Sequence, residues 1–238
     1  MADALLTAGA TVALASRESA RLHAAVRALR SRGLDAHALP MDVREPQAVD
    51  AAAVHALREL GGVDLVVNNA GIGMRTVNPR FLTEPRPFFE IDPDRFRDVV
   101  ATNLTGYFLV ARAFARHFVE RGRGRFVNVS VNRETMRRRG FVPYGPSRAG
   151  SEALSVIMAE DLRPFGICVN ILVPGGVTAT GMIPEDVPAA TRERMLRPEV
   201  MGPPIVFLAS AEAEGLTGQR IEARDFDRWL EEHRSRPG

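Results

Sequence analysis

Apolar runs alternate with segments of helical spacing along most of the chain. Short runs rich in apolar and β-branched residues predict strands, and these runs cover residues 11–15, 36–39, 63–67, 126–129 and 167–173. Segments with apolar residues on one helical face predict helices, and these segments cover residues 19–32, 46–60, 93–121, 147–163 and 203–211. Strands that alternate with helices of this length need crossover connections, which cover both faces of a parallel sheet. The pattern therefore predicts an α/β fold with a doubly wound parallel sheet.

Polar and glycine-rich residues gather where the predicted strands end. They are Ser16-Arg17, Asp42-Val43, Asn68 to Gly71, Ser130, and Pro174-Gly175-Gly176. The carboxyl ends of parallel strands meet at one edge of a sheet, so we expect a ligand crevice there. No internal repeat or linker interrupts the pattern. We therefore expect a single domain over residues 1–238, with a flexible tail over residues 230–238.

Two connections, 72–91 and 178–202, are long and rich in proline. Long connections without regular structure are uncommon in a compact domain and are usually functional or disordered. Both follow predicted strand ends. They either cover a bound substrate or form surface insertions.

The composition excludes several classes of protein. The 31 basic and 29 acidic residues give a net charge of +2, which offers no electrostatic case for nucleic-acid binding. The chain contains no lysine, so every basic residue other than histidine is an arginine. The single cysteine, Cys168, is expected to be a buried thiol. No apolar run is long enough to span a membrane and no leader opens the chain, so the cytoplasm is the expected location.

The stretch YGPSR, residues 144–148, places Tyr144 and Arg148 four residues apart at the start of a predicted helix. Residues at this spacing lie on one helical face. A phenol beside a fixed cation is either a proton-donating pair or an ordinary cap with a surface charge. The two residues alone leave both interpretations open.

Several motifs in order along the chain resemble the short-chain dehydrogenase/reductase family. They are Asn68-Asn69-Ala70-Gly71 (NNAG), Asn103, Ser130, Tyr144-x-x-x-Arg148, Pro174-Gly175, and the segment 207–219 near the C-terminus. The resemblance implies a Rossmann-like fold and an NAD(P)-dependent oxidoreductase of the carbonyl reductase or alcohol dehydrogenase type. It also implies a small carbonyl or alcohol substrate, no metal, and a homodimer or homotetramer built on the long helices.

By this resemblance, Tyr144 is the catalytic acid/base and Arg148 is the cation beside it. A phenol has an unperturbed pKa of about 10, and a nearby cation stabilises its charged form. Arg148 would also bind the nicotinamide ribose, Ser130 would hydrogen-bond the substrate oxygen, and Asn103 would hold a water in the proton path.

The resemblance also implies the residues that hold the cofactor. Asp42 and Val43 would lie near the adenine, and Asn69, Ala70 and Gly71 would line the adenosine side. The other implied contacts are Ser16, Arg17, Tyr144, Arg148, Pro174, Gly175 and Val177. An acidic residue after the second family strand would select NAD. Arg17 stands there instead and favours the 2′-phosphate of NADP, with NAD still possible, unless Arg17 is only a surface charge.

The N-terminal region departs from the family pattern. The chain resembles the family from its first helix onward, without the preceding central strand and its glycine-rich phosphate-binding turn. Either Met1 is an internal residue of a longer protein, or the product is damaged or repurposed. In the second case two neighbouring strands lose their ladder partners.

Two further departures concern the catalytic residues. Arg148 replaces the family lysine, and arginine keeps the charge but is bulkier and planar. The usual family serine stands where this chain has Val131, so Ser130 or Asn132 would have to replace it. Four arginines follow, Arg133, Arg137, Arg138 and Arg139; they suit either an anionic substrate or a solvated loop. A catalytically silent nucleotide-binding or oligomerising module is the rival prediction to the enzyme.

Overall fold

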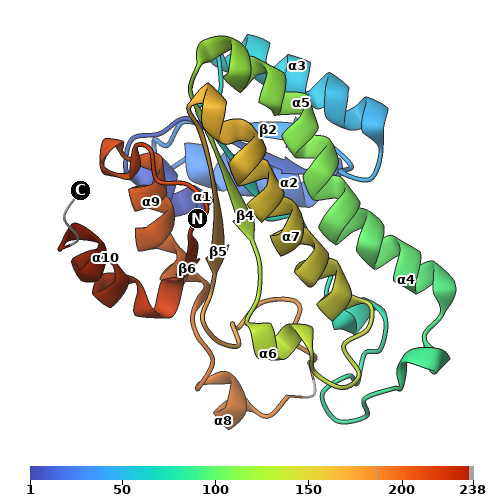
Figure 1. Ribbon diagram of the computed structural model, residues 1–238. Helices are drawn as coiled ribbons and strands as arrows, with labels where there is room; N and C mark the ends of the chain where they lie inside the picture. Colours follow the sequence, from blue (N-terminus) through green and yellow to red (C-terminus); the bar gives the residue numbers. More distant parts are fainter. Residues whose placement is uncertain (186, 236–238) are drawn as a thin grey trace.

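Figure 1 shows the computed structural model of the chain, in which residues 1–185 and 187–235 are described. All strand pairs are parallel, as predicted. The strands are β1 (Val12–Ser16), β2 (Ala36–Pro40), β3 (Leu65–Asn68), β4 (Gly124–Val129), β5 (Ile167–Val173) and β6 (Arg220–Glu222). The last strand was not predicted, because three residues are too few to show a period.

Helices cover both faces of the strands, which confirms the predicted α/β class. The helices are α1 (Ala2–Thr7), α2 (Ala20–Arg30), α3 (Pro46–Leu60), α4 (Pro93–Val100), α5 (Gly106–Arg121), α6 (Arg133–Met136), α7 (Tyr144–Leu162), α8 (Ala189–Arg192), α9 (Gly202–Ala209) and α10 (Phe226–Arg234). In Figure 1 the helices α4, α5 and α7 lie to the right of β4 and β5, and α9 and α10 lie to the left.

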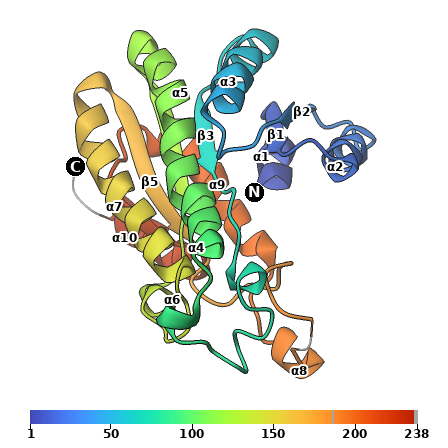
Figure 2. The same cartoon turned by 90° about the vertical axis from the view of Figure 1, so that its right-hand side faces the viewer.

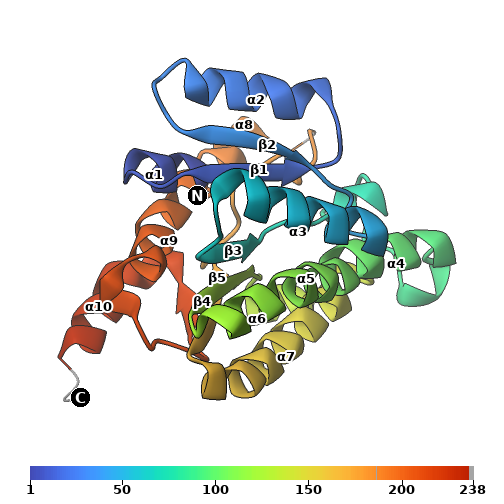
Figure 3. The same ribbon diagram turned by 90° about the horizontal axis from the view of Figure 1, so that it is seen from above.

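The strands form two sheets rather than one. Among the described residues β1 pairs only with β2, and β3, β4, β5 and β6 pair in that order. Figures 2 and 3 show β1 and β2, with α1 and α2, standing apart from β3. Within the described residues no strand joins β1 to β3. The split lies where the sequence suggests that a central strand is missing.

Two apolar cores hold the layers together. On one face, Phe118 of α5 meets Phe126 of β4 edge to face, with ring centroids 5.0 Å apart. On the other face, Leu172 of β5 packs in a cluster with Ile205 and Leu208 of α9. Because β4 and β5 are covered on both sides, they form the rigid centre from which the candidate site is built.

The predicted helix 93–121 is interrupted by a π-helical turn over Ala101–Thr105. Such turns are rare and often occur at functional sites. The Thr102 hydroxyl donates to the carbonyl of Asp98 at 2.8 Å within this segment. The turn contains Asn103, which is fully buried.

The C-terminal segment differs from the expected tail. Residues up to Arg234 form α10, and its Trp229 stacks against Phe226 and meets Phe207 of α9 edge to face. The remainder of the expected tail, 236–238, lies outside the described residues. Cys168 is buried as predicted, and burial raises the pKa of its thiol. In the described part of the chain, none of the helices combines the length and the apolar character needed to cross a membrane.

The split between the sheets predicts unequal hydrogen exchange. Backbone amides of β1 and β2 should exchange faster than those of β4 and β5. In the described part of the chain, β1 and β2 pair only with each other, whereas β4 and β5 have partners on both sides. Hydrogen–deuterium exchange with mass spectrometry on peptides that cover 12–16 and 124–129 measures the difference. Equal protection of the two segments would show that the split is closed in solution.

Candidate active site

Tyr144 is the first residue of α7 and is 9% exposed. It packs in an apolar cluster with Met74 and Phe81 of the long connection 72–91 and with Phe141. The next residue, Gly145, has no side chain, and a Cβ there would lie 2.2 Å from the carbonyl oxygen of Met136. The glycine therefore lets α6 pack onto the first turn of α7, and the connection 72–91 covers Tyr144 from another side.

Arg148 lies one turn further along α7 and is almost completely buried, at 3% exposed. Its Nη1 donates to the hydroxyl of Tyr107 at 2.6 Å and to the carbonyl of Val129 at 2.9 Å. The centre of the guanidinium lies 5.4 Å from the ring centroid of Tyr144 and 5.5 Å from that of Tyr107. The spacing that placed Tyr144 and Arg148 on one face thus brings a cation to within a cation–π distance of the phenol ring.

The phenol groups around Arg148 support its protonated form. Burial opposes the charge, but the phenol groups of Tyr107 and Tyr144 outweigh it and raise the pKa of Arg148 above its ordinary value. Burial also raises the pKa of the Tyr107 hydroxyl, and the charge of Arg148 offsets only part of this rise. Arg148 is therefore a permanent buried cation, and Tyr107 a neutral phenol that bonds to it.

Gly71 of the NNAG motif makes room for this guanidinium. A Cβ at position 71 would lie 2.3 Å from Nη2 of Arg148 and 3.2 Å from the side-chain oxygen of Asn103. The glycine therefore allows the backbone after β3 to approach Arg148 and Asn103 together.

Asn103 joins three elements of the site. Its Oδ1 accepts from the amide of Ile72 at 2.9 Å, and its Nδ2 donates to the carbonyl of Ile72 at 3.0 Å. The same Nδ2 donates to the hydroxyl of Ser147 at 3.2 Å, and this hydroxyl donates to the carbonyl of Tyr144 at 2.8 Å. Asn103 thus fixes the end of the NNAG segment against the first turn of α7. Its role in holding a water stays a prediction.

Ser130 directly follows β4 and is buried. Its amide continues the ladder to the carbonyl of Leu172 at 3.0 Å, but its Oγ has no hydrogen-bond partner among the described residues. The Nε of Arg148 is the other buried side-chain atom without a partner there. Val131 packs beside the cluster of Tyr144, and Asn132 precedes α6 and is half-buried. The two unsatisfied groups are the kind that a bound ligand would satisfy.

A largely shielded ion pair supports the backbone at this point, which the sequence did not indicate. Arg220 of β6 and Glu152 of α7 are 17% and 15% exposed, and their charged groups lie 3.1 Å apart. Nη2 of Arg220 also donates to the carbonyl of Val131 at 2.9 Å. The pair thereby fixes the strand end that carries Ser130 and Val131.

The residues expected near the adenine lie at the ends of β1 and β2, in the separate two-stranded sheet. Asp42 accepts from Nε and Nη2 of Arg44 at 3.0 and 2.7 Å, and these bonds lower the pKa of Asp42. Ser16 and Arg17 are exposed, and the charge of Arg17 also lowers this pKa. Arg44 is a second basic residue at this end that the sequence analysis did not identify.

The remaining predicted contacts lie along the edge between these two regions. Val43 packs against Gly106 at the start of α5, where a Cβ would lie 2.8 Å from Cγ2 of Val43. Asn69 is exposed and Ala70 half-buried, directly before Gly71. After β5, Gly175 adopts a φ of +86° and Val177 is exposed. The carbonyl of Pro174 accepts from the amide of Arg224 at 3.1 Å.

The second long connection meets the first. Arg75 pairs with Glu185 at 2.5 Å and donates to the carbonyl of Gly181 at 3.2 Å. The carboxyl ends of β4 and β5 point towards this region, at the bottom of Figure 1, where α6 and α8 also lie. The arginines of the loop 133–139 are exposed. The geometry thus places both long connections over one edge of the sheet.

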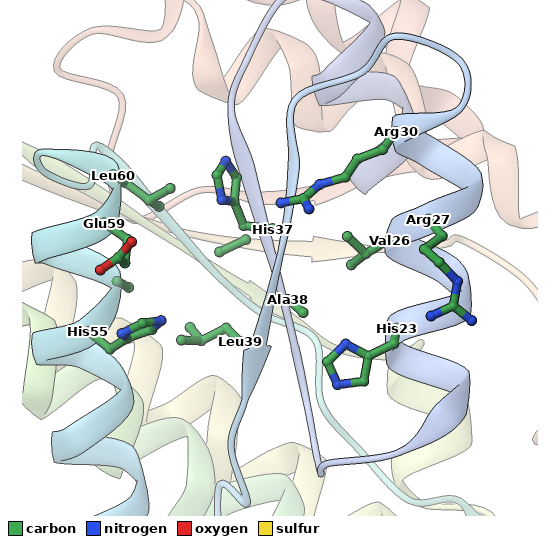
Figure 4. Close-up of a pocket in the computed structure, with 12 residues that line it drawn as sticks. His23, Val26, Arg27, Arg30, His37, Ala38, Leu39, His55, Glu59 and Leu60 are labelled. Carbon is green, nitrogen blue, oxygen red and sulfur yellow. The ribbon is translucent and has the colours of Figure 1, made fainter.

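A cavity of about 280 Å³ lies elsewhere, beside β2 and between α2 and α3 (Figure 4). Its polar lining residues include His23, Arg27, Arg30, His37, His55 and Glu59. His23 pairs with Glu18 and His37 with Asp35. None of the predicted site residues lines it, and the described residues contain no group of three His, Cys, Asp or Glu side chains arranged to hold a metal.

Comparison with known proteins assigns the class. The sequence profile of the family described as short chain dehydrogenase matches residues 1–190. The chain belongs to this family.

Two curated relatives show the range of names among similar proteins. The chain is 33% identical over 167 residues to the 5-keto-D-gluconate 5-reductase of Escherichia coli (strain K12). The alignment covers 70% of this chain and 62% of that protein. The chain is also 33% identical over 190 residues to the acetoacetyl-CoA reductase of Rhizobium meliloti (strain 1021). This alignment covers 76% of this chain and 75% of that protein.

A solved structure shares the architecture. The gluconate 5-dehydrogenase from Burkholderia cenocepacia J2315, in complex with NADP and tartrate, aligns with a TM-score of 0.80 and 28% identity. The alignment covers 92% of this chain and 86% of that one. The Rossmann-like assignment is therefore confirmed.

The tight packing around Gly71 predicts the effect of a single methyl group. Gly71→Ala should displace Arg148 or the NNAG backbone and destabilise the protein by about 1–3 kcal/mol, because the new Cβ would overlap the guanidinium. Gly181→Ala is the matched control, since a Cβ at Gly181 meets nothing within 4 Å. Urea unfolding measures both variants. Equal stability of the two would contradict the close approach of Arg148 to Gly71.

Proposed function

We propose that this protein is a nicotinamide-dependent oxidoreductase that interconverts a carbonyl compound and its alcohol. The observation that carries the proposal is the buried cation of Arg148 against the ring of Tyr144, together with the buried hydroxyl of Ser130, which has no hydrogen-bond partner among the described residues. The reductase and dehydrogenase names of the relatives support the same class of reaction.

In this proposal Tyr144 transfers the proton. A bound nicotinamide would supply the hydride to the carbonyl carbon. The Tyr144 phenol donates its proton to the carbonyl oxygen, and the charge of Arg148 stabilises the phenolate that remains. The Ser130 hydroxyl, which has no partner among the described residues, donates a hydrogen bond to the same oxygen. Asn103 anchors Tyr144 through Ser147, so the phenol is held in place for the transfer.

The residues at the other end of the site favour NADP over NAD. Arg17 follows β1 and is exposed, so its guanidinium is available to a 2′-phosphate, whereas Arg44 is held by Asp42 at 2.7 Å. Arginine suits phosphate because its planar N–H groups form paired hydrogen bonds. The proposed fit to the cofactor rests on residues at its nicotinamide end, Tyr144 and Arg148, and at its adenine end, Arg17 and Asp42.

The substrate is proposed to be small and to bind beneath the two long connections, near Tyr144. The exposed arginines of residues 133–139 would suit an anionic substrate. The names of two relatives, which contain a keto acid and a coenzyme A ester, support this proposal. Assembly into a homodimer or homotetramer is proposed from exposed apolar side chains on the long helices, Phe96, Phe108, Val156 and Ile157. The cytoplasm is the proposed location.

The direct test of the proposal is NADPH-dependent reduction of 5-keto-D-gluconate and acetoacetyl-CoA, followed by absorbance at the nicotinamide band. Tyr144→Phe should lower kcat by about 10²-fold or more, because general acid catalysis contributes at least that much. NADPH should support a higher kcat/KM than NADH. Thermal melting of the variant confirms that it folds. Equal turnover by both proteins would remove Tyr144 from the mechanism and favour the catalytically silent module.

A further inference from the structure

Tyr107 lies one helical turn after Asn103, on α5, and is 1% exposed. Its hydroxyl donates to the carbonyl of Val129 at 3.0 Å and accepts from Nη1 of Arg148 at 2.6 Å. We infer that Tyr107 is a positioning residue for the proposed reaction, whose hydroxyl holds the guanidinium of Arg148 under the ring of Tyr144.

The contacts around Nη1 form a closed triangle. Nη1 has two hydrogens, and it gives one to Tyr107 and one to the carbonyl of Val129. The Tyr107 hydrogen goes to the same carbonyl. Every hydrogen of the triangle is therefore used, and the direction of the guanidinium is fixed by two partners rather than one.

The opposite side of the guanidinium is closed as well. Gly71 lies so close to Nη2 that even a Cβ would overlap it. With Tyr107 on one side and Gly71 on the other, the guanidinium keeps its place 5.4 Å from the Tyr144 ring centroid. Without the Tyr107 hydroxyl, a buried N–H of Arg148 loses its partner, and the group should shift to find another.

The need for Tyr107 follows from the shape of arginine. A guanidinium is planar with fixed N–H directions, so it must be oriented by partners on the matching sides. A lysine ammonium is compact and its three donors rotate. The Tyr107 hydroxyl should therefore matter with arginine at position 148 and matter little with lysine there.

The inference rests on the proposed function, and a double-mutant cycle tests it. The proteins are wild type, Tyr107→Phe, Arg148→Lys and the double variant, with kcat, KM for NADPH and Tm measured for each. Thr217→Val is the matched control, because it also removes one hydrogen-bonded hydroxyl. The oxygen of this hydroxyl accepts from the amide of Val169 at 3.0 Å, and Thr217 lies outside the site.

We expect Tyr107→Phe to lower kcat about tenfold in the Arg148 protein and less than twofold in the Arg148→Lys protein, with KM for NADPH nearly unchanged. Thr217→Val should lower Tm and leave kcat unchanged. An equal loss of kcat from Tyr107→Phe in both backgrounds would overturn the inference, as would a loss no larger than that of Thr217→Val.

The melting data separate this inference from the proposed function. If the wild-type protein reduces neither substrate, the proposed function fails. The Tm values of the four proteins still test whether Tyr107 holds Arg148. A loss of Tm in the double variant that is smaller than the sum of the two single losses would show that Tyr107 and Arg148 interact, and would support the inference. Strictly additive losses would overturn it.

Discussion

A permanently charged guanidinium lies in the interior of this protein, and the surrounding structure meets the cost of placing it there. Arginine cannot lose its charge by titration, so burial of Arg148 is unfavourable unless its N–H groups have partners. The carbonyl of Val129 and the hydroxyl of Tyr107 accept both hydrogens of Nη1, and two aromatic rings lie within cation–π distance of the guanidinium. The Nε of Arg148 is buried and has no hydrogen-bond partner among the described residues. The family resemblance implies that Arg148 binds the nicotinamide ribose.

This constraint links elements that are distant in the sequence. Val129 ends β4, Tyr107 belongs to α5, and Gly71 follows β3, so the guanidinium of α7 joins three neighbouring elements. Asn103, in its π-helical turn, ties the same NNAG segment to the first turn of α7 through Ser147. The candidate site is therefore part of the centre of the fold, and the two long connections lie over it.

The strand and helix order followed from the sequence, because periodicity is a local property, and the four-residue spacing placed Tyr144 and Arg148 on one helical face. A site role for Asn103 was implied only by the family resemblance, and the approach of Gly71 to Arg148 was not predicted. The π-helical turn, the Arg220–Glu152 pair and α10 depend on contacts with distant residues, so local patterns did not reveal them. The role of Tyr107 could have been suspected from its position four residues after Asn103, on the same helical face. The sequence could not decide which of Ser130, Val131 and Asn132 faces the site. A shift of one residue at a strand end turns a side chain to the opposite face of the sheet.

The central claim is that Arg148 acts as the cation beside Tyr144 rather than as a structural charge. The most direct test compares kcat for Arg148→Lys and Arg148→Met, with melting curves to confirm that both fold. Lysine keeps a positive charge near the phenol, whereas methionine is an apolar side chain without charge. The account predicts that the lysine protein keeps turnover within about tenfold of wild type and that the methionine protein loses about 10²-fold or more. Equal turnover of the two folded proteins would contradict a catalytic role for the charge.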